Sequence, residues 1–262
     1  MKAPLALLAA ISLATGTAAA DTRMSYSTPG GSSPQIAIKG DQIRMEGSDR
    51  GRGITLFDAS SRQMTVIDPS KRNYYRMDAE SMKQQGRQMS EQMRQMREQM
   101  EKQLENMPEE QRKMMRKQME QMMPDQPAAS AGGEVRFESS GESARVAGIA
   151  CEISTVYREG EPIQRVCIAS PGSLGMSSGD RDTLRSLFSF LQEMASSFGG
   201  AHMGAQVPAK MMETFDGVPI RSEDLQGQKS WTLRNVETGN IDAAEFSIPS
   251  GYTEVEPFSM NQ

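Results

Sequence analysis

Hydrophobic and polar residues alternate in short runs over the first part of the chain, which predicts β-strands separated by tight turns. The turns carry Gly, Pro, Asp or Ser, as at Gly40-Asp41 and Asp68-Pro69-Ser70. Because no helix-length segment separates the strands, the pattern predicts an antiparallel meander and disfavours the parallel sheet of nucleotide-binding folds. The predicted strands are 23–27, 35–39, 42–46, 53–58, 63–68 and 73–77.

Residues 78–123 consist almost wholly of Met, Gln, Glu, Lys and Arg, and their apolar positions repeat with helical spacing. At roughly 100° per residue these apolar side chains fall within about 40° of one line along a helix. Pro108 ends or kinks this helix, and a second helical piece at 109–123 can pair with the first as a hairpin or coiled coil. The stripe comprises Met82, Met89, Met93, Met96, Met100, Leu104 and Met107.

The methionine stripe has three open interpretations. The side chains can form an apolar packing seam, or a flexible surface that adapts to hydrophobic ligands, partner helices or a second copy of the chain. Alternatively, their soft thioether sulfurs can ligate Cu(I) or Ag(I). The adaptable-binding hypothesis uses Met82, Met89, Met93, Met96, Met100 and Met107, and the metal hypothesis uses Met89, Met93, Met96 and Met100.

The second half of the chain returns to strand-like sequence after a linker rich in Pro, Ala, Ser and Gly at 124–133. A helix is predicted at 180–198, with Asp180 as its cap and Gly199-Gly200 at its end. Its predicted apolar face consists of Leu184, Leu187, Phe188, Leu191, Met194, Ala195 and Phe198. The last predicted strands are 217–222, 229–236 and 244–248.

Cys151 and Cys167 are the only cysteines, and an even pair in an exported chain predicts a disulfide. They lie in strand-like stretches at 150–157 and 162–169, joined by a turn that contains Gly160. With a three-residue turn, Tyr157 faces Glu161 and Cys151 lies directly opposite Cys167. The CxxC spacing of redox-active pairs is missing, so we expect a structural bridge.

The N-terminal residues have the pattern of a secretory signal peptide. Lys2 is followed by an apolar run at 5–13 and by Ala18-Ala19-Ala20, which predicts cleavage after Ala20. The apolar run is shorter than the roughly 20 residues that span a bilayer, and no cysteine follows it for lipid attachment. We therefore expect a periplasmic protein without a stable membrane anchor.

Short motifs occur in a characteristic order along the chain. They are Gly40-Asp41-Gln42-Ile43-Arg44-Met45, Ile67-Asp68-Pro69, Tyr74-Tyr75, Ala147-Gly148-Ile149-Ala150-Cys151, Gly217-Val218-Pro219-Ile220 and Phe246-Ser247-Ile248-Pro249-Ser250-Gly251-Tyr252. In this order they resemble uncharacterised secreted bacterial domains near the LolA/LolB lipoprotein-carrier superfamily. The resemblance implies an α+β fold in which an incomplete antiparallel barrel is covered by helices, and in the carriers the hollow of that barrel holds acyl chains. This chain departs from the carriers by beginning with a strand instead of a helix.

These observations predict a curved, LolA-like antiparallel sheet with a covering helix and a long Met-rich helical insertion. We divide the chain into a signal peptide (1–20), the first half of the sheet (21–77), the insertion (78–123), the linker (124–133) and the second half of the sheet (134–262). The net charge of −5 argues against a nucleic-acid partner.

Catalytic chemistry has weak support in the sequence. The segment from Gly175 to Gly179 matches G-x-S-x-G, and His202 is the only histidine. That motif requires a strand-to-helix turn in an alternating α/β sheet, whereas meander strands surround it here. We therefore expect a non-enzymatic protein without a cofactor that binds a hydrophobic ligand or an envelope partner. The alternatives are a soft-metal binder and a structural envelope protein.

Overall fold

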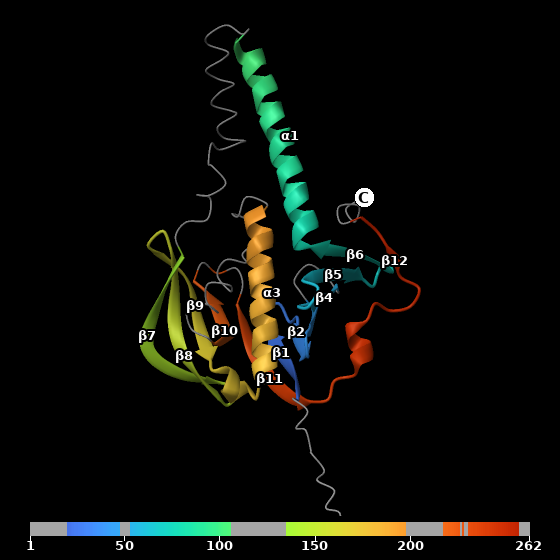
Figure 1. Cartoon of the computed structure of the whole chain (residues 1–262). Coiled ribbons are helices and arrows are strands. Elements are labelled where there is room, and N and C mark those ends of the chain that lie inside the picture. The colour runs from blue at the N-terminus through green and yellow to red at the C-terminus, as the bar shows by residue number, and fades with distance from the viewer. Residues whose placement is uncertain are drawn as a thin grey trace, which may run out of the picture.

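The computed structural model describes residues 20–47, 53–105, 135–197, 217–225, 227 and 230–256. Twelve strands form one open, curved sheet with the order β12-β6-β5-β4-β3-β2-β1-β11-β10-β9-β8-β7 (Figure 1). All neighbours pair antiparallel except β12 and β6, so the predicted curved antiparallel sheet is confirmed apart from this one parallel pair.

The first six strands are β1 (Asp21–Ser27), β2 (Gln35–Lys39), β3 (Gln42–Glu46), β4 (Ile54–Asp58), β5 (Gln63–Asp68) and β6 (Asn73–Asp78). The other six are β7 (Val135–Val146), β8 (Ile149–Arg158), β9 (Glu161–Ala169), β10 (Val218–Asp224), β11 (Trp231–Gly239) and β12 (Thr253–Glu254). The helices are α1 (Ala79–Glu105), η1 (Pro171–Leu174), α3 (Ser178–Ser197) and η2 (Ala243–Phe246).

Strands β1 to β6 form the meander that the turn residues predict. The Gly40-Asp41 turn brings Ile38 opposite Ile43, and Gly40 has a φ of 55° that glycine adopts without strain. Strand β1 pairs with β2 on one side and with β11 on the other. The centre of the sheet therefore joins the first and last parts of the described chain.

Helix α3 packs along one face of the sheet, where it lies across the central strands (Figure 1). Leu184, Leu187, Phe190 and Met194 are buried there, and the ring of Phe190 lies 5.4 Å from that of Phe57 on β4. The predicted apolar face missed Phe190, which is fully buried. Phe188 and Leu191 are only partly buried at the margin of the core.

The N-terminus of α3 also differs from the prediction. Ser177, not Asp180, is the capping residue, because the Ser177 hydroxyl accepts a hydrogen bond from the backbone N–H of Asp180 at 3.0 Å. The Asp180 carboxylate accepts a reciprocal bond from the Ser177 N–H at 3.3 Å. This is a capping box with Asp at the third helical position. The motif S-x-x-D, here Ser177 to Asp180, indicates such a capping box, and the prediction took Asp180 as the cap instead of Ser177.

The residues after β11 cross the face of the sheet opposite α3. Residues 244–248, predicted as a strand, instead include the short 3-10 helix η2, whose Asp242 side chain caps the N–H of Ala244. Phe246 packs with Ala37 and Ile241, and Glu245 pairs with Arg23 at 2.7 Å. The strand prediction was wrong because the Asp242 cap and the burial of Phe246 favour a helical turn. The chain then reaches the sheet edge, where β12 pairs with β6 (Figure 1).

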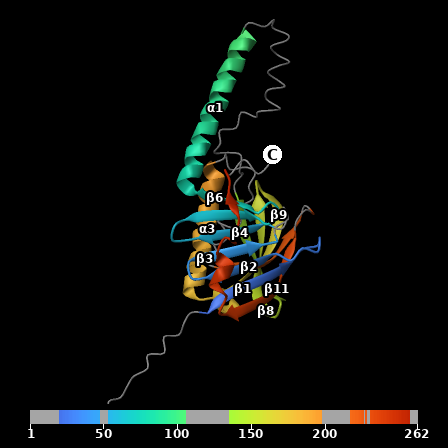
Figure 2. The same ribbon diagram turned by 90° about the vertical axis from the view of Figure 1, so that its right-hand side faces the viewer.

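Helix α1 follows β6 directly and projects away from the sheet (Figures 1 and 2). The structure shows a helix from Ala79 to Glu105, within the segment predicted to be helical. Met107, the second predicted helix at 109–123 and the linker at 124–133 lie outside the described residues, as do residues 1–19, His202 and Phe198.

The hairpin of β8 and β9 holds the disulfide between Cys151 and Cys167, whose Cα atoms lie 5.4 Å apart. The predicted register was wrong. Arg158 pairs with Glu161 across a two-residue turn, and an irregularity after Val156 brings Ile153, instead of Cys151, opposite Cys167. Cys167 is therefore bridged to a residue two positions away from its pairing partner in the strand register. A β-bulge of this kind has no marker in the sequence.

Candidate functional site

Asp78 sets the start and direction of α1. Its carboxylate accepts hydrogen bonds from the Ser81 backbone N–H at 2.8 Å and from the Ser81 hydroxyl at 2.7 Å. These bonds hold the pKa of Asp78 below its usual range, so the cap is ionised at neutral pH. Because Asp78 is also the last residue of β6, the sheet edge fixes where the helix leaves the body.

Only the first turns of α1 pack against the rest of the protein. Met82 is 5% exposed and belongs to the same core as Phe190 and Met194 of α3. Gly86, one turn further along, is also buried, and α1 contacts α3 in this region. The first member of the methionine stripe is therefore a packing residue.

The remainder of α1 projects away from the sheet (Figures 1 and 2). From Arg87 onward, every residue of α1 whose side chain the structure describes is exposed, and Met96 is 53% exposed. Charged side chains flank the stripe, where Arg94 pairs with Glu91 at 2.7 Å and lies 3.9 Å from Glu98. Such exposed pairs stabilise a helix only weakly. Helix α1 therefore has a solvent-exposed charged face beside a line of apolar positions that includes Met96.

The described side chains test the proposed stripe only in part. Met89, Met93 and Met100 lie on α1, so their helical spacing is as predicted, but their side chains are outside the part of the chain that the structure describes. Met82 is buried, whereas Met96 is open to solvent. The ligand-binding and soft-metal hypotheses for these methionines stay predictions.

The G-x-S-x-G segment has a structural role in the fold. Gly175 ends the 3-10 helix η1 with a φ of 70°, and Ser177 caps α3 through Asp180. The Ser177 hydroxyl is thus engaged at a helix N-terminus. In a nucleophile elbow the serine follows a strand through a sharp strand-to-helix turn. Here the 3-10 helix η1 precedes Ser177 instead.

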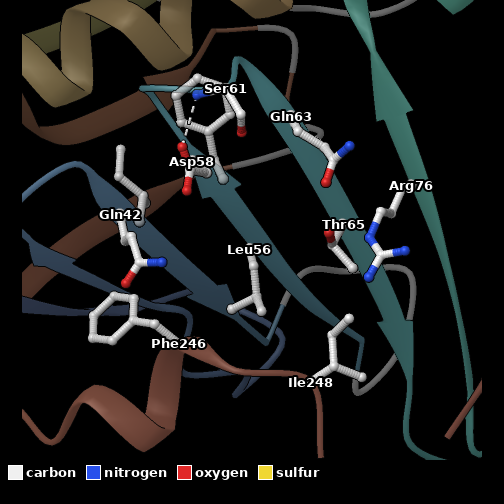
Figure 3. Close-up of a pocket in the computed structure, with 11 residues that line it drawn as sticks. Gln42, Leu56, Asp58, Ser61, Gln63, Thr65, Arg76, Phe246 and Ile248 are labelled. Atoms are coloured by element: carbon white, nitrogen blue, oxygen red, sulfur yellow. Dashed lines mark hydrogen bonds between the residues drawn. The ribbon is translucent and has the colours of Figure 1, made fainter.

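A second candidate site is a pocket on the face of the sheet opposite α3 (Figure 3). It encloses about 220 Å³ between strands β3 to β6 and the segment that follows η2. Leu56 and Ile248 form an apolar side, while Thr65 and Arg76 lie together on the other (Figure 3). The lining residues are Gln42, Ile43, Leu56, Phe57, Asp58, Ser61, Gln63, Thr65, Arg76, Phe246 and Ile248.

The charged groups of this pocket already have protein partners. Arg76 donates to both carboxylate oxygens of Glu254 at 2.8 Å. Asp58 accepts bonds from the Ser60 hydroxyl and from the Ser61 N–H, and the second of these is drawn in Figure 3. Their pairing leaves amide and hydroxyl groups, such as those of Gln42 and Thr65, as the groups open to a small neutral ligand. The sequence does not reveal this pocket, because its walls come from strands and a C-terminal segment that meet only in the fold.

The described residues contain no group of three or more His, Cys, Asp or Glu side chains that could hold a metal ion. Within the same residues, no helix has the length and apolarity needed to cross a membrane.

The fold and its sites define an α+β protein with an open antiparallel sheet, an internal disulfide and a projecting helix. The chain belongs to the DUF4412 family, a domain of unknown function, whose model matches residues 71–252. The match includes β6, α1, the disulfide hairpin, α3 and the strands β10 and β11. Among curated proteins we find no match to this chain.

Solved structures with related outlines are larger proteins. Two crystal forms of PNGF-II align over 91% and 93% of this chain and 32% of theirs, at 7% and 8% identity and a TM-score of 0.39. MucB in complex with MucA(peri) aligns over 88% of this chain and 54% of its own, at 12% identity and a TM-score of 0.32. The chain thus spans about a third of PNGF-II and about half of MucB.

Proposed function

We propose that this chain is an exported, non-enzymatic binding protein that holds hydrophobic segments of partner proteins on the methionine face of α1. One observation carries the proposal: α1 is anchored by Met82 at its base, while Met96 lies exposed beyond the body of the protein. A long helix that presents an apolar line to solvent is a common form of peptide and helix recognition.

Methionine suits this role chemically. Its side chain is unbranched and polarizable, so one surface can adapt to apolar partners of different shape. The flanking charges of Glu91 and Arg94 keep the helix soluble and leave the apolar line as the surface that binds hydrophobic partners. Association through the same line with a second copy of the chain belongs to the same proposal.

The space between α3 and the sheet is filled by side chains, which directs the proposal to α1. Phe57, Phe190, Ile43 and Leu187 are all buried in this core. In a fold like that of the LolA/LolB carriers, the same region would hold the acyl chain. We therefore place the binding surface on the projecting helix. A relationship in fold to the LolA/LolB carriers is also part of the proposal.

Export to an oxidising compartment completes the proposed function. The disulfide between Cys151 and Cys167 is of the kind found in exported proteins. Asp21, the first residue after the predicted cleavage site, is also the first residue of β1 and is buried. Cleavage after Ala20 would thus leave the sheet intact.

The test compares two charge-matched double variants of α1. Met93→Glu with Met96→Glu places two carboxylates on the methionine line, and Gln92→Glu with Gln99→Glu places two on positions about 80° to 100° away from its centre. We measure suppression of aggregation of a chemically unfolded model protein, and binding of the dye 1-anilinonaphthalene-8-sulfonate. Circular dichroism checks that both variants keep the helix.

The wild-type protein and the glutamine variant should suppress aggregation at near-stoichiometric ratios, and the methionine variant should lose most of this effect. Equal activity of the two variants would overturn the proposal, and so would a wild-type protein that neither suppresses aggregation nor binds the dye.

A further inference from the structure

Three arginines line one open pocket at the junction of β7, β10 and β11. Arg145, Arg221 and Arg234 surround a depression of about 450 Å³ together with Val146, Ala147, Thr232 and Leu233. No acidic side chain lines it. The protein carries a net charge of −5, so this pocket is a region of local positive charge on a negatively charged protein.

Local irregularities of the backbone bring these arginines together. On β11, Asn235 pairs with Ser25 and Leu233 with Tyr26, so Arg234 is the extra residue of a bulge. On β10 a second irregularity falls between Pro219 and Arg221. Bulges redirect side chains and are frequent at binding sites.

The tip of the β7–β8 hairpin supplies the third arginine. Its two-residue turn has positive φ at Ala147 (50°) and Gly148 (81°), which is the conformation of a tight hairpin turn. The guanidinium of Arg145 donates one hydrogen bond back to the Gly148 carbonyl at 3.0 Å. That bond holds Arg145 against its own hairpin, and its other N–H groups stay available.

The three guanidinium groups have no carboxylate partner among the described residues. Most other arginines of the sheet do have one, such as Arg23 with Glu245 and Arg76 with Glu254. Arginine stays protonated at all physiological pH values, so three positive charges in one pocket repel one another unless an anion is bound. Arg221 faces Thr232 across β10 and β11, which adds a hydroxyl donor to the same pocket.

We propose that Arg145, Arg221 and Arg234 form a binding site for a phosphate group. A carboxylate has only two oxygens, too few to pair bidentately with three planar guanidinium groups, whereas a phosphate presents three or four oxygens to charge-assisted, bidentate bonds. The pocket is open, so the phosphate can belong to a soluble compound or to a phospholipid headgroup. This site is separate from α1 and does not depend on the proposed function.

The experiment uses the mature protein and two probes. Isothermal titration with inorganic phosphate measures binding of the free anion. Flotation with vesicles of phosphatidylglycerol in phosphatidylcholine, compared with pure phosphatidylcholine vesicles, measures binding to a phospholipid headgroup. The variants are Arg234→Gln and Arg145→Gln, both at exposed positions. Arg158→Gln is the control, since Arg158 is also exposed and lies at the opposite end of β8 from the Ala147 turn.

Each pocket variant should weaken binding of at least one probe by about tenfold or more, the usual effect of losing a charge-assisted hydrogen bond. The control should bind like the wild type. Binding of phosphate alone identifies a soluble phosphate compound, and binding of vesicles identifies a phospholipid headgroup. The site is overturned if the wild type binds neither probe, or if Arg158→Gln weakens binding as much as the pocket variants do.

Discussion

The Thr22 hydroxyl donates a hydrogen bond of 2.7 Å to the Asp180 carboxylate, and both side chains are almost fully buried. This bond joins the first strand to the first turn of α3, across 158 positions of sequence. Asp180 also accepts from the Ser177 N–H, so one carboxylate completes the helix cap and docks the helix on the sheet. A negative charge at a helix N-terminus is further stabilised by the helix dipole.

Replacing Thr22 by Val should destabilise the protein. The change keeps the side-chain shape but leaves the buried Asp180 carboxylate without one donor, which costs about 2 kcal/mol in the free energy of unfolding. Urea denaturation followed by tryptophan fluorescence of Trp231 measures the loss. Thr253→Val, at an exposed position on β12, should change the free energy of unfolding by no more than about 0.5 kcal/mol. Equal losses in the two variants would show that the Thr22 bond has no special role.

Tyr26 should make the fold sensitive to alkaline pH. Burial raises the pKa of the Tyr26 phenol above its usual range. The unfolded chain therefore releases this proton near pH 10 while the folded chain keeps it, so the free energy of unfolding falls as pH rises further, by up to about 1.4 kcal/mol per pH unit.

The variant Tyr26→Phe isolates this effect. Urea midpoints measured between pH 8 and about pH 11 should decline less steeply for Tyr26→Phe than for the wild type. Tyr252→Phe, a partly exposed position, serves as the control and should follow the wild type. A Tyr26→Phe profile that is parallel to the wild type would contradict the prediction.

The disulfide should contribute substantially to stability. Cys151 and Cys167 are separated by 16 positions, and closing a loop of this length stabilises by about 3 kcal/mol in the chain-entropy model. The double variant Cys151→Ala with Cys167→Ala should show this loss in urea denaturation, and the reduced wild type should match it. Dithiothreitol must lower the midpoint of the wild type but leave the double variant unchanged. A wild type insensitive to reductant would refute a stabilising bridge.

The soft-metal hypothesis for α1 makes a separate prediction. Native mass spectrometry during titration with Ag(I), a stable substitute for Cu(I), should show stoichiometric binding if the thioethers are ligands. Replacing Met89, Met93, Met96 and Met100 by Leu keeps the helix, because leucine is a good helix former, but should remove the metal. The control Met45→Leu with Met77→Leu alters two methionines of the sheet and should leave silver uptake unchanged. Wild-type protein without bound silver would exclude this hypothesis.

Local signals in the sequence predicted the meander well. Gly40-Asp41 and Asp68-Pro69-Ser70 mark turns because their preferences act over a few bonds and do not depend on distant residues. The helical spacing of the segment after Asp78 is local in the same sense, and α1 is helical from Ala79 to Glu105. The pairing of Cys151 with Cys167 followed from an even cysteine pair in a chain predicted to be exported, with both cysteines in strand-like stretches.

Features that depend on packing were missed or placed incorrectly. Phe190 did not stand out from the apolar positions of α3, yet it is the residue that meets Phe57. The register of the disulfide hairpin depends on a bulge, and the turn at η2 depends on the burial of Phe246 against Ala37 and Ile241, which local preferences do not encode.

The sequence by itself thus determined the strands of the meander, the methionine helix and the partners of the disulfide, because these arise from neighbours along the chain. Met82 and Met96 have the same side chain and lie on the same side of α1, so only the tertiary structure decided that Met82 is buried while Met96 is exposed. It also decided that Arg145, Arg221 and Arg234 share one pocket. The physical reason is the same in each case: exposure and charge clustering depend on contacts between segments far apart in the chain.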